Sequence, residues 1–171
     1  WLLGSSDYSA RLAAAMGLPF SFADFFGNTS EHGPKIADLY RDSFQPSPYL
    51  SEPRINVTLQ VICASTEEEA NFIGASRNLN KILSTLGLLT EGLLPPEEAI
   101  EWPLDKNSKA YMEQSTKGYI QGNPNQVRDG ILSSIERYGT SDIGIVTNCY
   151  YFKDRKKSYE LVAKCLDITP V

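Results

Sequence analysis

The chain has 171 residues, of which 42% are hydrophobic and 22% are charged, as in ordinary globular proteins and unlike disordered or collagen-like chains. Sixteen Lys and Arg against 21 Asp and Glu give a net charge of -5, so the positive excess that nucleic-acid binding requires is missing and no nucleic-acid partner is expected. The apolar stretches stop well short of the roughly 20 residues that span a bilayer, so we also expect no membrane span.

The N-terminal part predicts a strand, a helix and a second strand. Residues 1–4 are an apolar run that indicates the end of a strand. Every fourth residue from Tyr8 to Met16 is then apolar, which predicts a helix, and Gly17 is suited to a left-handed helix stop. Residues 18–26 follow with alternating aromatic side chains, which are typical of a strand.

The middle of the chain predicts two further helices and one strand. Residues 36–44 place apolar side chains on one helical face, and the three prolines of residues 45–53 indicate a loop. Residues 55–64 alternate between apolar and polar before becoming wholly apolar, as a strand does. Thr66 and the three glutamates after it fit a capping box, which opens a helix that we expect to end near Leu86.

The C-terminal part continues the alternation of helices and strands. Asn123 followed by Pro124 predicts a capped helix that ends at Gly139. Residues 141–147 indicate a short buried strand, and Asp154 opens a final helix.

This alternation predicts one α/β domain over residues 1–171. Parallel neighbours cannot be joined by a tight hairpin, so about four parallel strands linked by crossover helices are expected. Within residues 88–121 the periodicity weakens into prolines and polar residues. We interpret this segment as a long inserted connection, of the kind that often lies over a site, and not as a second domain.

The scarcity of histidine and the placement of the cysteines exclude several chemistries. His32 is the only histidine and lies in a turn-rich loop, so Ser-His-Asp catalysis, Cys-His catalysis and most zinc sites are not expected. Cys63, Cys149 and Cys165 lie far apart in apolar segments, which predicts buried reduced thiols and a cytoplasmic protein.

A phosphate-binding turn is one interpretation of Gly4, Ser5 and Ser6, which lie where a strand leads into a helix. The free N–H groups and the dipole of a helix start favour an anion, and two small hydroxyls add donors. The alternative is that Ser6 or Asp7 only caps the helix. The chain lacks the dinucleotide-binding and P-loop glycine patterns, so a simpler phosphate cup remains.

Several blocks of the sequence resemble a known family. Residues 3–14 and 17–23 closely resemble the middle of bacterial luciferase-like, flavin-dependent monooxygenases. Residues 154–163 resemble the final helix of that family, and Gly122-Asn-Pro-Asn-Gln-Val127 is similar to its Gly-x-Pro-x-x-Val helix start. The matches follow the family's order, so the resemblance covers essentially the whole chain.

The resemblance implies a TIM barrel, (β/α)8, that binds FMN at the carboxyl ends of its strands, and this chain resembles its C-terminal half. In the family, one matched block cradles the flavin phosphate and a matched strand runs beneath the isoalloxazine ring. The implied cofactor-binding residues are Gly4, Ser5, Ser6 and Tyr8 for the phosphate, and Phe22, Ala23 and Asp24 for the ring. Related sequences often carry histidine where this chain has Asp24 and Phe25, and no catalytic residue is predicted.

The function implied by the resemblance is that of an alkanal-type monooxygenase, which uses reduced FMN and O2 on a small organic substrate such as an aliphatic aldehyde. The alternatives are a non-catalytic flavin- or phosphate-binding protein and a deazaflavin-dependent oxidoreductase. Half a barrel has unpaired strand edges and an uncovered inner face. We therefore expect an inactive fragment that associates with the missing N-terminal half or forms a homodimer.

Overall fold

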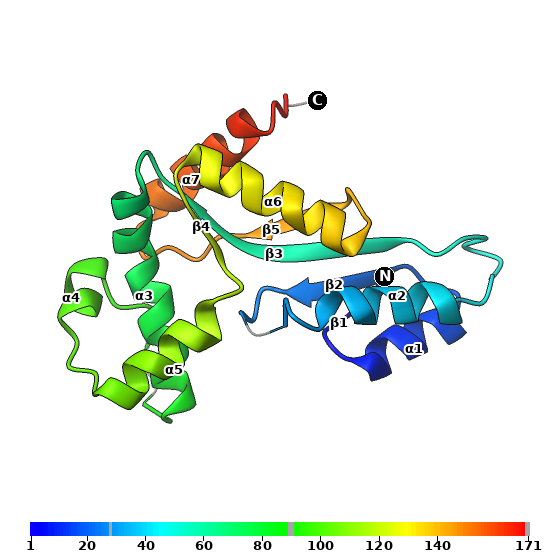
Figure 1. Cartoon of the computed structure of the whole chain (residues 1–171), viewed down its shortest axis with the longest axis horizontal. Helices are drawn as coiled ribbons and strands as arrows, with labels where there is room; N and C mark the ends of the chain where they lie inside the picture. Colours follow the sequence, from blue (N-terminus) through cyan, green and yellow to red (C-terminus); the bar gives the residue numbers. More distant parts are fainter. Residues whose placement is uncertain (28, 89–90, 170–171) are drawn as a thin grey trace.

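A parallel sheet forms the centre of the structure, a computed structural model that describes residues 1–27, 29–88 and 91–169 (Figure 1). In this part of the chain the strands are β1 (Leu2–Gly4), β2 (Phe20–Asp24), β3 (Ile55–Cys63), β4 (Ile120–Gly122) and β5 (Ile143–Val146). Their order is β1, β2, β3, β4, and β5 also pairs with β3. The parallel pairing confirms the predicted α/β class.

Helices connect the strands as crossovers. They are α1 (Asp7–Ala15), α2 (Gly33–Ser43), α3 (Glu67–Thr85), α4 (Pro96–Glu101), α5 (Lys106–Thr116), α6 (Pro124–Tyr138) and α7 (Phe152–Cys165). Helices α3, α4 and α5 gather beyond the carboxyl end of β3, away from α1 and α2 (Figure 1). None of the helices in the described ranges is long and apolar enough to cross a membrane.

The main core lies between one face of the sheet and the helices α1, α2, α6 and α7. Phe20 and Phe22 of β2 pack there against Tyr40 of α2 and Tyr138 of α6, with ring centroids 5.4 and 5.7 Å apart. Because side chains alternate along a strand, Ser21 belongs to the opposite face. Its hydroxyl donates a hydrogen bond of 3.0 Å to the Asn56 side chain of β3, so that face is partly polar.

Helix α1 is present as predicted, but its apolar stripe is on the outside. Tyr8 is 75% exposed, and Leu12 and Met16 are also exposed. The face that packs inward consists instead of Ser9, Ala10, Ala13 and Ala14. Small side chains allow α1 to lie close to α2 and the sheet, so close packing decided the orientation of this helix.

The helix ends follow the local signals closely. Gly139 directly after α6 and Gly17, which follows the C-cap Met16 of α1, both have φ +60, as the left-handed stop predicts. The Thr66 hydroxyl caps α3, but the Glu69 side chain accepts from the Ser65 N–H and not from that of Thr66, so the predicted capping box is incomplete. Helix α7 begins at Phe152, two residues before the predicted Asp154.

Three further features differ from the prediction or add to it. Strand β4 was not predicted; it is short and lies at the end of residues 88–121, after α4 and α5. Strand β5 is half-buried along its length and not buried as expected. Cys63 is buried, whereas Cys149 and Cys165 are only partly so. Burial raises the pKa of the Cys63 thiol to about 11.

Candidate functional site

The strand register brings the two predicted groups of cofactor residues to one edge of the sheet. Gly4, the last residue of β1, pairs with Phe22 of β2. Ser5 and Ser6 follow β1 directly, and Asp24 is the last residue of β2. Because the strands are parallel, both groups lie at the carboxyl ends, where barrels of this type place their sites.

Gly4 allows the end of β1 to lie unusually close to the first turn of α1. A Cβ atom at this position would be 2.2 Å from the Oγ atom of Ser9. No side chain fits at that distance, so glycine is required for this strand-to-helix turn. The predicted phosphate cup therefore has a tightly built base.

The helix start is a complete capping box. The Ser6 hydroxyl accepts the Ser9 N–H at 3.3 Å, and the Ser9 hydroxyl accepts the Ser6 N–H at 3.2 Å. Ser6 therefore does cap the helix, as the alternative interpretation held. Among the described residues, the N–H groups of Asp7 and Tyr8 have no hydrogen-bond partner. These two groups and the half-buried Ser5 are what the turn offers to an anion.

The residues predicted for the flavin ring do not share one face of β2. Phe22 is fully buried and packs against Tyr138, on the side of the sheet that the helices cover. Asp24 also faces that side, because its carboxylate reaches the same tyrosine. Ala23 belongs to the opposite face, with Ser21.

Asp24 is a buried polar residue at this edge that two hydroxyl groups hold in place. It is 2% exposed, and its carboxylate accepts hydrogen bonds of 2.7 Å from the hydroxyls of Tyr138 and Thr29. Burial raises the pKa of Asp24, and the two hydrogen bonds act in the opposite direction. Burial and the neighbouring carboxylate raise the pKa of Tyr138, which keeps its hydroxyl protonated as a donor.

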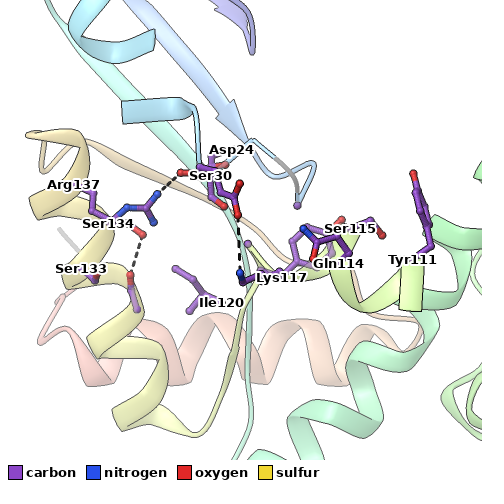
Figure 2. Close-up of a pocket in the computed structure, with 15 residues that line it drawn as sticks. Asp24, Ser30, Tyr111, Gln114, Ser115, Lys117, Ile120, Ser133, Ser134 and Arg137 are labelled. Carbon is purple, nitrogen blue, oxygen red and sulfur yellow. Dashed lines mark hydrogen bonds and ion pairs between the residues drawn. The ribbon is translucent and has the colours of Figure 1, made fainter. Parts of the chain in front are cut away.

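A cavity of about 540 Å³ adjoins Asp24 (Figure 2). Its walls come from the loop after β2, from α5 with the turn that follows it, and from one side of α6. The lining residues include Ser30, Glu31, Tyr111, Gln114, Ser115, Lys117, Tyr119, Ser133, Ser134 and Arg137. Among the lining residues, only Asp24 was predicted from the sequence as a site residue.

Charged side chains and glycines hold the walls of this cavity together. The Arg137 guanidinium donates to the Ser30 carbonyl oxygen (Figure 2). The Lys117 Nζ atom lies 4.0 Å from Glu31 Oε1. The Gly118 N–H donates to the Gly27 carbonyl oxygen at 3.1 Å, which docks the α5–β4 turn on the loop after β2. The connection between α3 and β4 therefore contributes one wall of the cavity.

Comparison with known proteins relates the chain to one group of enzymes. No family model matches it. It is 30% identical over 161 residues to a luciferase-like monooxygenase of Escherichia coli K12, an alignment covering 94% of this chain and 47% of the relative. The chain spans about half the length of the curated relatives it matches.

Solved structures show the same fold. The crystal structure of apo-MsnO8 matches with a TM-score of 0.85 and 31% identity, over 100% of this chain and 51% of that one. The oxygenating constituent of 3,6-diketocamphane monooxygenase from Pseudomonas putida, solved with FMN, matches with a TM-score of 0.58 and 19% identity, over 99% of this chain and 48% of that one. The chain thus has the fold of one half of a luciferase-like barrel, as predicted.

Proposed function

We propose that this chain belongs to the luciferase-like monooxygenase family and carries part of the FMN site of an enzyme that uses reduced flavin and O2 on a small organic substrate. The observation that carries the proposal is the register that sets the β1–α1 turn beside the end of β2. A phosphate cup and a strand end at one edge of a parallel sheet suit the two ends of a flavin mononucleotide. An aliphatic aldehyde is the substrate we would test first.

The phosphate end of the flavin would lie at the start of α1. The N–H groups of Asp7 and Tyr8 and the hydroxyl of Ser5 are the donors available there. The helix dipole favours an anion at this position. The Asp7 carboxylate would repel a phosphate at this position. The attraction of the backbone N–H groups therefore has to exceed the repulsion of this one negative charge.

The ring end would lie over the face of β2 that carries Ala23. Ala23 has a small side chain but is only 2% exposed, so a flat group would have to lie over its neighbours on the same face, such as Ser21, whose hydroxyl is bonded to Asn56. Phe22 and Asp24 would support this strand from the helix side. Bound reduced flavin supplies the oxygen chemistry; the chain would orient it and exclude water.

Oxygen uptake by the intact protein tests the proposal. With reduced FMN and a panel of straight-chain aldehydes, we expect O2 consumption that depends on the aldehyde and yields an oxygenated product. Tight FMN binding without substrate-dependent uptake would favour the non-catalytic flavin-binding alternative. Copurification of a deazaflavin in place of FMN would instead favour the deazaflavin-dependent oxidoreductase.

A further inference from the structure

Arg77 of α3 carries a buried charge that is not neutralised by any carboxylate in the described ranges. The residue is 5% exposed, and its Nη1 atom has no hydrogen-bond partner. The guanidinium carbon of Arg77 lies 4.2 Å from the centroid of the Tyr119 ring. Burial lowers the pKa of Arg77 to about 10, so the group still carries its charge at neutral pH. Buried charges are ordinarily paired, which makes this cation unusual.

The hydrogen bonds that Arg77 does make go to neutral amide oxygens. Its Nε and Nη2 atoms donate to Asn78 Oδ1 at 3.1 and 3.0 Å, and Nη2 also donates to Gln121 Oε1 at 2.5 Å. The NH2 group of Gln121 in turn donates to Asn71 Oδ1 at 2.7 Å. Because a guanidinium can only donate, the Asn78 and Gln121 amides must turn their oxygens toward Arg77. The Asn71 amide turns its oxygen toward the Gln121 NH2 group.

One chain of hydrogen bonds runs from Arg77 to Asn78, and the other runs from Arg77 through Gln121 to Asn71. The NH2 groups of Asn71 and Asn78 are the free ends of these two chains. Asn71 and Asn78 lie two turns apart on α3, and both line a cavity of about 660 Å³ between α3, α4 and α5. Gly74 lies between them, and a Cβ atom there would be 2.1 Å from Gln121 Oε1. A glycine inside the helix therefore provides the space in which the Gln121 amide lies.

The rest of the cavity is mainly apolar. Leu79, Ile100, Trp102 and Met112 are among its lining residues. Lys109 and Glu113 of α5 also line it, and their opposite charges leave little net charge on that wall. The cavity thus combines an apolar wall with one polar end whose free groups are donors. Arg77 does not itself line the cavity; it is bonded to the Asn78 and Gln121 amides that do. The volume of the cavity is in the range of small-molecule sites.

We propose that this cavity binds an amphipathic anion, an apolar chain with a terminal carboxylate, whose head group accepts hydrogen bonds from the Asn71 and Asn78 amides beside Arg77. The carboxylate brings a negative charge near Arg77, with the amides between the two charges, and the chain lies against Trp102 and its apolar neighbours. This site is separate from the flavin edge at β1 and β2, and it does not depend on the proposed monooxygenase function.

Octanoate is the probe, and Trp102 is the reporter. The chain has two tryptophans, so a Trp1→Phe background leaves Trp102 as the only one. Without flavin present, titration with octanoate should shift the Trp102 emission and saturate. Octan-1-ol has the same chain without the charge and should bind about tenfold or more weakly. Equal affinities for the two probes, or no saturable shift with octanoate, would overturn the proposal.

Asn78→Asp tests the polar end without changing its shape. The new carboxylate removes a donor and pairs with Arg77, so octanoate should bind about tenfold or more weakly while octanol binding is little changed. The matched control is Asn80→Asp, which makes the same charge change on α3 at a position that does not line the cavity. An equal loss in both variants would refute the site. If circular dichroism shows that Asn78→Asp does not fold, Asn71→Asp at the same polar end is tested instead. The same selective loss of octanoate binding is then expected.

Discussion

The Tyr138 hydroxyl donates a hydrogen bond of 2.7 Å to Asp24 Oδ2, which joins the last residue of α6 to the last residue of β2. The same tyrosine ring packs against Phe22. One side chain therefore fixes both the direction of the β2 carboxyl end and the position of α6 behind it. Through this contact, the helix layer supports the edge where we place the flavin.

Replacing Tyr138 by Phe should destabilise the fold. The ring would remain, but the buried Asp24 carboxylate would keep only its bond from Thr29. The loss of one such partner costs about 1–3 kcal/mol in free energy of unfolding. Urea unfolding measures it. The control is Tyr159→Phe, because the Tyr159 hydroxyl makes only an exposed bond of 3.5 Å to the Ile145 carbonyl oxygen. An equal effect of the two variants would contradict the role given to Tyr138.

Asp24 should also make stability depend on pH. Its pKa is raised in the folded state, so the native protein binds more protons than the unfolded chain between about pH 4 and the raised value. Stability must then fall as the pH rises through this window. Asp24→Asn removes this contribution. It also removes the carboxylate that helps to raise the pKa of Tyr138, but a tyrosine titrates above this pH window in either case.

The measurement is urea unfolding of both proteins from about pH 4 to about pH 8. We expect the free energy of unfolding of the wild type to decline relative to the variant as the pH rises from about 4, and to level off once Asp24 is ionised in both the folded and the unfolded state. A difference that stays constant over the whole range would show that Asp24 titrates alike in the folded and unfolded states.

Much of the edge formed by the carboxyl ends of β1 and β2 could be predicted from the local sequence, whereas the tertiary contacts that support this edge could not. Gly4, Ser6 and Gly17 have local conformational roles, so composition and spacing identify the strand, cap and stop. The bond between Asp24 and Tyr138 joins residues 114 positions apart and depends on tertiary packing. Arg137 has an exposed position on α6 and carries no local signal of a cavity.

Two features of the fold could not be predicted from the sequence, for clear physical reasons. The spacing of Tyr8, Leu12 and Met16 identified a helix correctly but not its buried face, because the alanines of α1 allow closer packing than the larger side chains do. Strand β4 is three residues long and pairs only with the end of β3, so it is too short to show a period of two.

Gly27 should tolerate no side chain. It has φ +90, and a Cβ atom would be 2.1 Å from the Ser115 carbonyl oxygen, where the α5–β4 turn docks. Gly87 provides a control, because it has φ +73 but nothing within 4 Å of its Cβ position. Alanine at either site carries the cost of a positive φ angle, about 1–2 kcal/mol. Only Gly27→Ala adds a collision of the new Cβ atom with the Ser115 carbonyl oxygen.

Urea unfolding and limited proteolysis of the loop after β2 distinguish the two glycine variants. Gly27→Ala should lose clearly more stability than Gly87→Ala and should be cut faster, because the turn no longer docks. Equal losses of stability and equal rates of cleavage would mean that backbone strain alone matters at Gly27.

Ser5→Asp should weaken FMN binding in the intact protein. The added charge repels the phosphate at the start of α1, and a donor is lost. Riboflavin, which lacks the phosphate, should be much less affected. Ser51→Asp makes the same charge change on an exposed loop and serves as the control. Fluorescence titration of both ligands measures the affinities, and equal losses for FMN and riboflavin would show that the phosphate lies elsewhere.

The described half-barrel should associate with a partner. In the described ranges β1 pairs only with β2, and β5 only with β3, so each has an edge free of strand pairing. The exposed stripe of Tyr8, Leu12 and Met16 adds apolar surface on α1. Unpaired edges and exposed apolar side chains favour burial against a second chain.

Size-exclusion chromatography with intact-mass analysis measures this association. We expect either a dimer of the 19.0 kDa chain or a complex with a co-eluting segment that supplies the other half of the barrel. The complex with the second half should bind FMN more tightly than the chain alone, because strands from both halves then surround the flavin. A monodisperse monomer that binds FMN tightly and oxidises an aldehyde would refute the half-barrel argument, since one half would then suffice for the whole site.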